Sequence, residues 1–107
     1  MKAGTIVVSD FPGVVNSKRR PSVVVSSETY HQSRPDVILA IITTNISAST
    51  SPTDYILQDW SAANLNRPSA VRIFLFTLPK NEVTKIGGLS ERDWTEVQKR
   101  LQISVEI

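Results

Sequence analysis

The sequence contains no cysteine and only one histidine, His31. Disulfide bonds, thiolate chemistry and cysteine-based zinc sites are therefore excluded. One histidine does not supply the several ligands of a zinc site, so we expect no metal and no cofactor. No apolar run approaches the roughly 18 residues of a membrane-spanning helix. The N-terminus lacks the features of a signal peptide, and we expect a cytoplasmic protein without a membrane partner.

The net charge is also small: 12 basic and 10 acidic residues give a formal net charge of +2. This value does not by itself indicate nucleic-acid binding, but the distribution of charge is uneven. Lys18, Arg19 and Arg20 are contiguous, and Glu28 is the only acid between residues 17 and 34. Lys18 and Arg19 are therefore candidates for phosphate contacts. A solvated run of surface charge is an equally good interpretation.

Short β-branched segments separated by polar loops make up most of the chain. We predict strands at residues 5–9, 22–26, 36–43 and 70–78, and shorter ones at 55–57 and 83–86. The segment 22–26 is apolar without alternation, which indicates burial on both faces. The segment 36–43 is the most apolar run in the chain, and its length and β-branching favour a strand over a buried helix. Residues 29–33 are predicted to be a polar loop that exposes His31. Residues 59–64 are predicted to form one or two helical turns with Asp59 as the N-cap.

One longer helix is predicted after residues 87–88. Ser90 is its expected N-cap, with Asp93 three residues later. Trp94, Val97 and Leu101 share one helix face, which indicates packing against a core. Residues 103–107 alternate between apolar and polar and are predicted to form an edge strand or a tail. Together the elements predict one α+β domain over residues 1–107, a small antiparallel β-barrel with a C-terminal α-helix.

Several short motifs follow one another in a set order along the chain. They are Gly4-Thr5-Ile6-Val7-Val8 before Asp10-Phe11, Arg20-Pro21 before Val23-Val24-Val25-Ser26, Ala40-Ile41-Ile42-Thr43-Thr44, Asp54-Tyr55-Ile56-Leu57 with Asp59-Trp60, and Pro68-Ser69-Ala70-Val71-Arg72 followed by Phe76-Thr77-Leu78, Ile86-Gly87 and Leu89-Ser90. Single motifs are not specific, but the ordered set spans nearly the whole chain. In this order the motifs resemble the MazF/PemK family of toxins, and the one at residues 54–60 resembles its PemK-like branch.

The resemblance implies an SH3-like barrel, a homodimer, and sequence-selective cleavage of single-stranded mRNA that inhibits translation and growth. It also implies a type II antitoxin whose acidic, flexible tail blocks the RNA groove. Such an endoribonuclease needs no metal if a cation and hydrogen-bond donors stabilise charge on the phosphoryl oxygens.

Arg20 and Thr43 match the catalytic positions of the family. A guanidinium offers a rigid fork of donors to phosphate oxygens, and Pro21 restricts the Arg20 backbone. Thr43 follows a buried strand, where its hydroxyl can contact the scissile phosphate. Thr44 and Asn45 come next and are candidates for RNA binding. From the pattern alone, a surface arginine and a β-forming threonine are the simpler interpretations.

Arg72 is a secondary candidate for substrate binding, because one branch of the family uses an arginine near this position. That branch has an acid two residues later, whereas this chain has Phe74. Many relatives also carry a Ser-Glu-Gln or His-Glu-Gln triplet before the catalytic arginine, and it is missing here. No clear general base remains, apart from the distant Asp10. Trp60 is predicted to pack in a core or interface, with base stacking as the alternative.

Two other functions fit the predicted fold. A gyrase poison of the CcdB kind acts by protein contact through its C-terminal residues, but residues 104–107 do not resemble that arrangement. A nucleic-acid-binding barrel without catalysis is the third possibility. The gyrase-poison alternative would also leave Arg20 and Thr43 unexplained.

Overall fold

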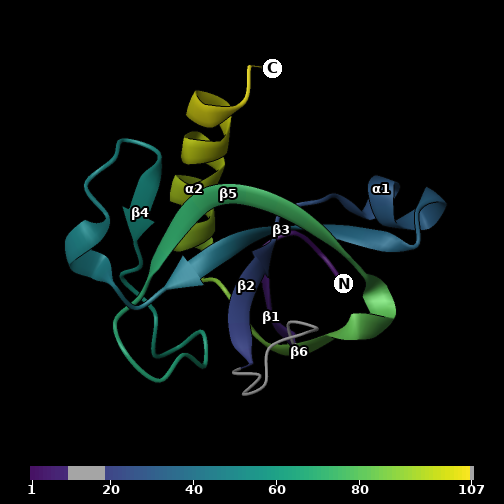
Figure 1. The fold of residues 1–107 in the computed structure, drawn as a ribbon, viewed down its shortest axis with the longest axis horizontal. Coiled ribbons are helices and arrows are strands. Elements are labelled where there is room, and N and C mark those ends of the chain that lie inside the picture. Colours follow the sequence, from purple (N-terminus) through teal and green to yellow (C-terminus); the bar gives the residue numbers. More distant parts are fainter. Residues whose placement is uncertain (10–18, 107) are drawn as a thin grey trace.

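A curved, six-stranded antiparallel sheet forms the centre of the protein, with a helix standing beside it (Figure 1). The computed structural model describes residues 1–9 and 19–106. The strands are β1 (Thr5–Ser9), β2 (Arg20–Val24), β3 (Asp36–Thr43), β4 (Asp54–Ile56), β5 (Ala70–Pro79) and β6 (Val83–Gly88). The helices are α1 (Glu28–Ser33) and α2 (Glu91–Ser104), with the 3₁₀ turns η1 (Ile46–Ala48) and η2 (Lys80–Glu82).

The strand order is β4-β5-β3-β2-β1-β6, and every pair is antiparallel. The predicted α+β class and C-terminal helix are thus confirmed. The ladder among the described residues does not close, since β4 and β6 are its edges. Register shifts bend the sheet, most clearly where Ala40 pairs with Leu75 and Ile41 pairs with Arg72. Such bulges increase the twist of a strand, and β5 arches over β3 in Figure 1.

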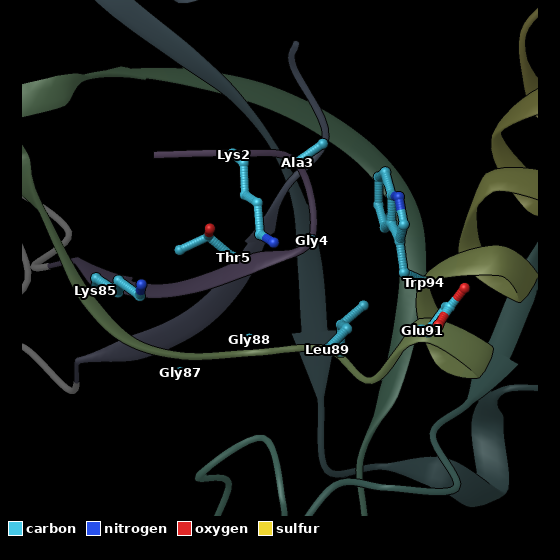
Figure 2. A pocket seen from close by; sticks show the side chains of 10 residues that line it. All are labelled: Lys2, Ala3, Gly4, Thr5, Lys85, Gly87, Gly88, Leu89, Glu91 and Trp94. Carbon is cyan, nitrogen blue, oxygen red and sulfur yellow. The ribbon is translucent and has the colours of Figure 1, made fainter. Parts of the chain in front are cut away.

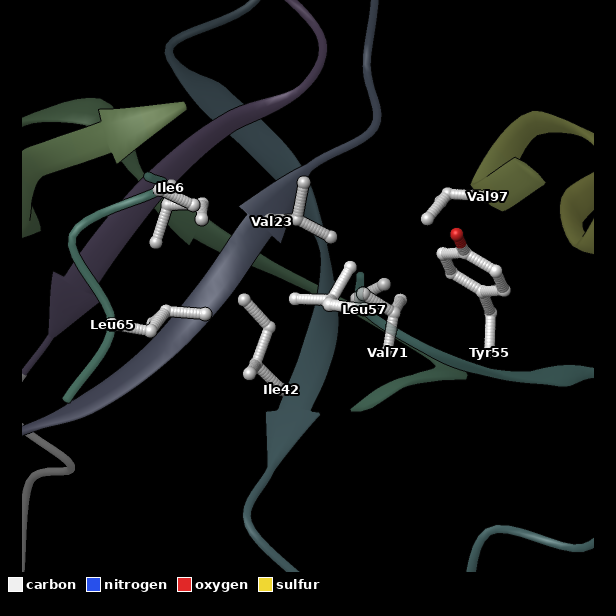
Figure 3. Close-up of a cluster of buried hydrophobic side chains, with 10 residues drawn as sticks. Ile6, Val23, Ile42, Tyr55, Leu57, Leu65, Val71 and Val97 are labelled. Atoms are coloured by element: carbon white, nitrogen blue, oxygen red, sulfur yellow. The ribbon is translucent and has the colours of Figure 1, made fainter. Parts of the chain in front are cut away.

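Buried side chains form two clusters, one on each face of the sheet. Neighbouring residues such as Val23 and Val24 fall into different clusters, as the lack of alternation predicted. The first cluster joins the sheet to α2, and Figure 3 shows Val97 near Tyr55. Val83 of β6 packs against the second cluster, as do Phe76 and Leu78 of β5, although three strands separate β5 from β6 in the ladder. The sheet therefore curls around the second cluster.

Two of the predicted strands, 5–9 and 36–43, are confirmed to the residue, and that at 70–78 extends by one residue. The shorter strands occur at 54–56 and 83–88. The prediction of 22–26 was wrong at both ends, because β2 begins at Arg20 and ends at Val24. Beyond that end the Ile38 amide donates to Ser26 Oγ at 3.0 Å, so a side chain takes the place of a ladder carbonyl.

The predicted polar loop at 29–33 is instead part of α1. Ser27 caps this helix by accepting a hydrogen bond from the Tyr30 amide, and Glu28 lies in its first turn. His31 is buried rather than exposed, and its Nε2 lies 2.5 Å from Ser26 Oγ. The histidine therefore joins α1 to the end of β2.

The segment 59–64 forms a single turn with the hydrogen-bond spacing of a helix and does not continue into a second one. The Ala63 amide donates to the Asp59 carbonyl, and Asn64 ends the turn with a φ of 65°. The Asp59 carboxylate does not cap this segment. It accepts hydrogen bonds from the Arg92 guanidinium and the Ser90 hydroxyl, which lower its pKa to about 2.

Helix α2 begins as predicted, with Ser90 accepting a hydrogen bond from the Asp93 amide. It runs to Ser104, so Ile103 is helical and the edge-strand alternative was wrong. Trp94 packs against the first cluster but is only half-buried, and Trp60 also packs there. Among the described residues, no helix is long and apolar enough to cross a membrane.

Candidate functional site

A positively charged groove of about 920 Å³ lies where β2 and β5 begin and β3 ends. Its described walls contain four arginines and no aspartate, glutamate or histidine. One wall, here called the strand wall, consists of Arg19, Arg20, Thr43 and Thr44. The other, the loop wall, consists of residues 64–67. Such a surface attracts an anionic polymer such as RNA, because its described lining carries positive charge and no acid.

The sheet register brings Arg20 and Thr43 together. Ser22 pairs with Ile41 between β2 and β3, and continuing this register by two residues places Arg20 opposite Thr43. Arg20 is exposed, and its side chain makes no hydrogen bond or ion pair within the part of the chain that the structure describes. Its guanidinium therefore keeps all its donors for a ligand.

Thr43 is half-buried, and its side chain is oriented by the backbone that follows. Its Oγ1 accepts a hydrogen bond from the Asn45 amide at 3.1 Å. The hydroxyl proton is therefore available for donation to another acceptor. Thr44 is exposed and lines the groove, whereas Asn45 is not among the lining residues and its Oδ1 accepts from Ser47 instead.

The other predicted cations are placed differently. Arg19 lines the groove and donates to Thr84 Oγ1 on β6 at 3.3 Å. Arg72 also lines it, but its guanidinium lies 3.7 Å from the nearly buried Asp54 carboxylate. Arg72 thus contributes a fixed, partly neutralised charge. Lys18 and the candidate base Asp10 lie outside the described residues.

Sequence reasoning missed the loop wall, including the exposed Arg67. A signal was present, since Arg20-Pro21-Ser22 and Arg67-Pro68-Ser69 repeat the same tripeptide. The first precedes the apolar part of β2, and the second immediately precedes β5.

A second, smaller hollow of about 380 Å³ lies beside β1, β6 and the start of α2 (Figure 2). Trp94 forms one side of it, next to Gly4. Lys2 and Lys85 share this hollow with Glu91, so its charge is mixed. Its lining includes neither of the predicted catalytic residues. Among the described residues, no group of three or more histidine, aspartate or glutamate side chains is placed to hold a metal ion.

Comparison with known proteins identifies the family. Residues 2–105 match the model of the PemK-like, MazF-like toxins of type II toxin–antitoxin systems. The endoribonuclease MazF of Staphylococcus saprophyticus is 29% identical over 110 residues, which cover 98% of this chain and 91% of that protein.

Solved structures share the fold at low sequence identity. A mycobacterial endoribonuclease in complex with its cognate antitoxin has a TM-score of 0.81 at 19% identity, covering 97% of this chain and 93% of that one. MazE–MazF (Form-II) from Deinococcus radiodurans has a TM-score of 0.76 at 17% identity, covering 100% and 96%. With a family model that spans nearly the whole chain, the predicted resemblance is confirmed, and the protein belongs to the PemK-like, MazF-like toxins of type II toxin–antitoxin systems.

Proposed function

We propose that this toxin cleaves single-stranded mRNA in the groove between the strand wall and the loop wall. The observation that carries the proposal is the juxtaposition of an unpaired Arg20 with Thr43 in a groove whose described lining has no acid. The relative from Staphylococcus saprophyticus bears the name of an endoribonuclease, which supports the same reaction class. Cleavage of mRNA stops translation and growth, and an mRNA substrate implies a cytoplasmic site of action.

In the proposed reaction the ribose 2′-oxygen attacks the adjacent phosphorus and the bond from phosphorus to the 5′-oxygen breaks. The 2′-hydroxyl loses a proton and the 5′-oxygen gains one, which yields a 2′,3′-cyclic phosphate and a 5′-hydroxyl. Arg20 contacts the non-bridging oxygens as negative charge grows on them. The Thr43 hydroxyl donates a hydrogen bond to the same phosphate, since its oxygen already accepts a hydrogen bond from the Asn45 amide.

Neither proton transfer is assigned to a described lining residue, because none of these is a histidine or a carboxylic acid. Asp10 is the candidate base that the sequence offers. Charge stabilisation by Arg20, Thr43 and the remaining groove arginines makes a metal unnecessary in this mechanism. Thr44 borders the same path, and we assign it a contact to the RNA backbone, with Lys18, Arg19 and Arg72 as positioning charges.

The antitoxin is proposed to act on the same groove. Solved relatives of the same fold include complexes of toxin with antitoxin. An acidic, flexible tail is complementary to the four lining arginines and would exclude RNA by occupying their donors. Raising the salt concentration should weaken such a complex, and an affinity independent of salt would contradict this interpretation.

A homodimer and an SH3-like barrel complete the proposal. Ile56, Phe74, Leu75 and Ile103 are exposed on β4, β5 and α2, and a second copy would cover apolar surface of this kind. Light scattering should give twice the chain mass, and a monomer at micromolar concentration would refute the dimer. The curling of β6 towards β5 supports classifying the open ladder as an SH3-like barrel.

The test is incubation of purified, antitoxin-free protein with a long single-stranded RNA in excess EDTA. Discrete fragments ending in cyclic phosphate and 5′-hydroxyl are expected, and a matched DNA strand should stay intact because it lacks the 2′-hydroxyl. Intact RNA would refute the ribonuclease. Inhibition of gyrase without RNA cleavage would then favour the CcdB-like alternative, and RNA binding alone would favour the non-catalytic barrel.

A further inference from the structure

We propose that Arg67 is a second phosphate-binding arginine of this site, which holds the RNA backbone next to the scissile phosphate. The inference rests on the proposed function and adds a residue to it. Its starting point is the repeated tripeptide Arg-Pro-Ser at residues 20–22 and 67–69.

The sheet topology places the two tripeptides on either side of one strand. β3 lies between β2 and β5 and is antiparallel to both, so β2 and β5 begin where β3 ends. At that end Thr43 pairs with Ala70 of β5, and Arg20 lies opposite Thr43 on the other side by continuation of the register. Arg67 precedes Ala70 by three residues. Two arginines therefore flank the threonine that is proposed to contact the scissile phosphate.

The backbone around Arg67 is anchored on its C-terminal side. The Ser69 hydroxyl donates to the Arg67 carbonyl at 2.8 Å, and the Ser69 side chain is 2% exposed. The Leu57 amide donates to the Ser69 carbonyl at 2.9 Å, and Pro68 restricts the residue before it. These contacts with the start of β5 thus fix the position of the Arg67 backbone.

The N-terminal side of the loop wall is anchored as well. Leu65 is 8% exposed and belongs to the first core cluster. Asn64 Nδ2 donates to the Ile86 carbonyl of β6 at 2.9 Å. A Cβ on Gly87 would lie 2.2 Å from the Ala63 carbonyl oxygen, so the turn rests directly on the β6 backbone. Arg67 is therefore presented by a loop held between β5 and β6, which reduces the ordering cost of binding a ligand.

The bonding of Arg67 differs from that of most other arginines. Arg34, Arg72, Arg92 and Arg100 each pair with a carboxylate. Arg67 makes no side-chain hydrogen bond or ion pair within the described part of the chain, as is true of Arg20. A positive side chain beside three other groove arginines gains no stability from them, and a bound anion relieves the repulsion.

The ligand that fits this arrangement is a phosphodiester chain. A single strand carries one phosphate per nucleotide, so one strand crossing the groove presents successive phosphates to its two walls. Arg20 then contacts the scissile phosphate, while Arg67 contacts a neighbouring one. Because this contact is equal in substrate and transition state, it lowers KM and leaves kcat unchanged.

The experiment compares wild type with Arg67→Ala, Arg67→Lys and the control Arg34→Ala on a fluorogenic RNA oligonucleotide in EDTA. The control removes an exposed arginine that does not line the groove. For Arg67→Ala we expect KM to rise by about tenfold, as for loss of one charge-assisted hydrogen bond, with kcat within about twofold of wild type. The slope of log(kcat/KM) against log salt should become shallower by about 0.7. Arg67→Lys should restore the slope, and Arg34→Ala should match wild type.

Two results overturn the inference and are distinguishable. If wild type cleaves RNA while Arg67→Ala retains both its KM and its salt slope, then Arg67 binds no phosphate and the proposed function stands. If wild type neither binds nor cleaves the oligonucleotide, both proposals fall. Circular dichroism verifies that each variant is folded. Because Arg67 is exposed, we expect its substitution to leave the fold intact.

Discussion

Replacing Asp93 by alanine should destabilise the fold strongly without removing any residue that lines the groove. The Asp93 carboxylate is fully buried and accepts three hydrogen bonds, from the Tyr55 hydroxyl at 2.6 Å and from the Gln58 and Asp59 amides at 3.1 and 2.8 Å. It therefore clamps the start of α2 to the chain that leaves β4. Alanine leaves these three donors without their acceptor, the Tyr55 hydroxyl in a buried position and the two amides in partly buried ones.

The magnitude follows from the number of bonds and the charge. Hydrogen bonds to an ionised group contribute about 1.5–3 kcal/mol each, and breaking a buried charged network costs about 3–5 kcal/mol in total. For a domain of this size, 1 kcal/mol corresponds to roughly 4 °C in Tm. We expect Asp93→Ala to lower the free energy of unfolding by about 3–5 kcal/mol and Tm by roughly 15 °C. Tyr55→Phe removes only one donor and should cost about 1 kcal/mol.

The assay is urea unfolding followed by circular dichroism at one fixed protein concentration, because dimerisation would make stability depend on concentration. Glu91→Ala is the matched control, since Glu91 is an exposed acid in the same first turn of α2. It should change stability by no more than about 1 kcal/mol through the helix dipole. A loss below about 1 kcal/mol for Asp93→Ala would refute the clamp.

Three further predictions test other parts of the structure. Gly87→Ala places a Cβ 2.2 Å from the backbone of the facing turn and should lower the free energy of unfolding in urea by about 1–3 kcal/mol. Gly88→Ala should lower it far less, because the nearest neighbour atom is 3.9 Å away. Equal effects would refute the close approach at Gly87. Thr43→Val should lower the single-turnover rate by about 10²-fold and Thr43→Ser should retain it, and equal rates for both would exclude a hydroxyl contact. The Arg92 guanidinium is the main cause that lowers the pKa of Asp59 from 3.8 to about 2, so the stability gained from ionised Asp59 is complete above about pH 4 and is lost as pH falls towards 2. When the urea midpoint is measured as a function of pH, Arg92→Ala should flatten the curve between about pH 4 and pH 2. An unchanged curve would contradict the pairing of Arg92 with Asp59.

The strands that the sequence predicts best are those whose burial is continuous. The run 36–43 is apolar on both sides and becomes β3 without a change of bounds, because it lies inside the sheet and contacts both clusters. β2 was misplaced by two residues because its start is polar. Arg20 and Pro21 carry no apolar signal, and only pairing with Ser9 and Val8 makes them part of the strand.

Tertiary contacts explain the features that sequence patterns did not predict. Ser27 followed by Glu28 is a capping signal for α1, but a six-residue helix with one buried residue has no apolar periodicity to reveal it. Asp93 fits a capping position, yet its carboxylate bonds to residues 55–59 of the chain. Arg67 is distant in sequence from Arg20. Only the pairing of β5 with β3 brings the loop wall, which contains Arg67, to the same groove as Arg20.

The most direct test of the account is the single-turnover rate of RNA cleavage in EDTA for wild type, Arg20→Ala and Arg34→Ala. If Arg20 stabilises charge on the scissile phosphate, its removal should lower the rate by about 10²–10³-fold, as for loss of one transition-state donor, while the Arg34 variant cleaves like wild type and all three proteins unfold at the same urea concentration. An Arg20→Ala variant that remains folded and cleaves RNA at the wild-type rate would contradict the central claim that this groove, through Arg20, is the ribonuclease site.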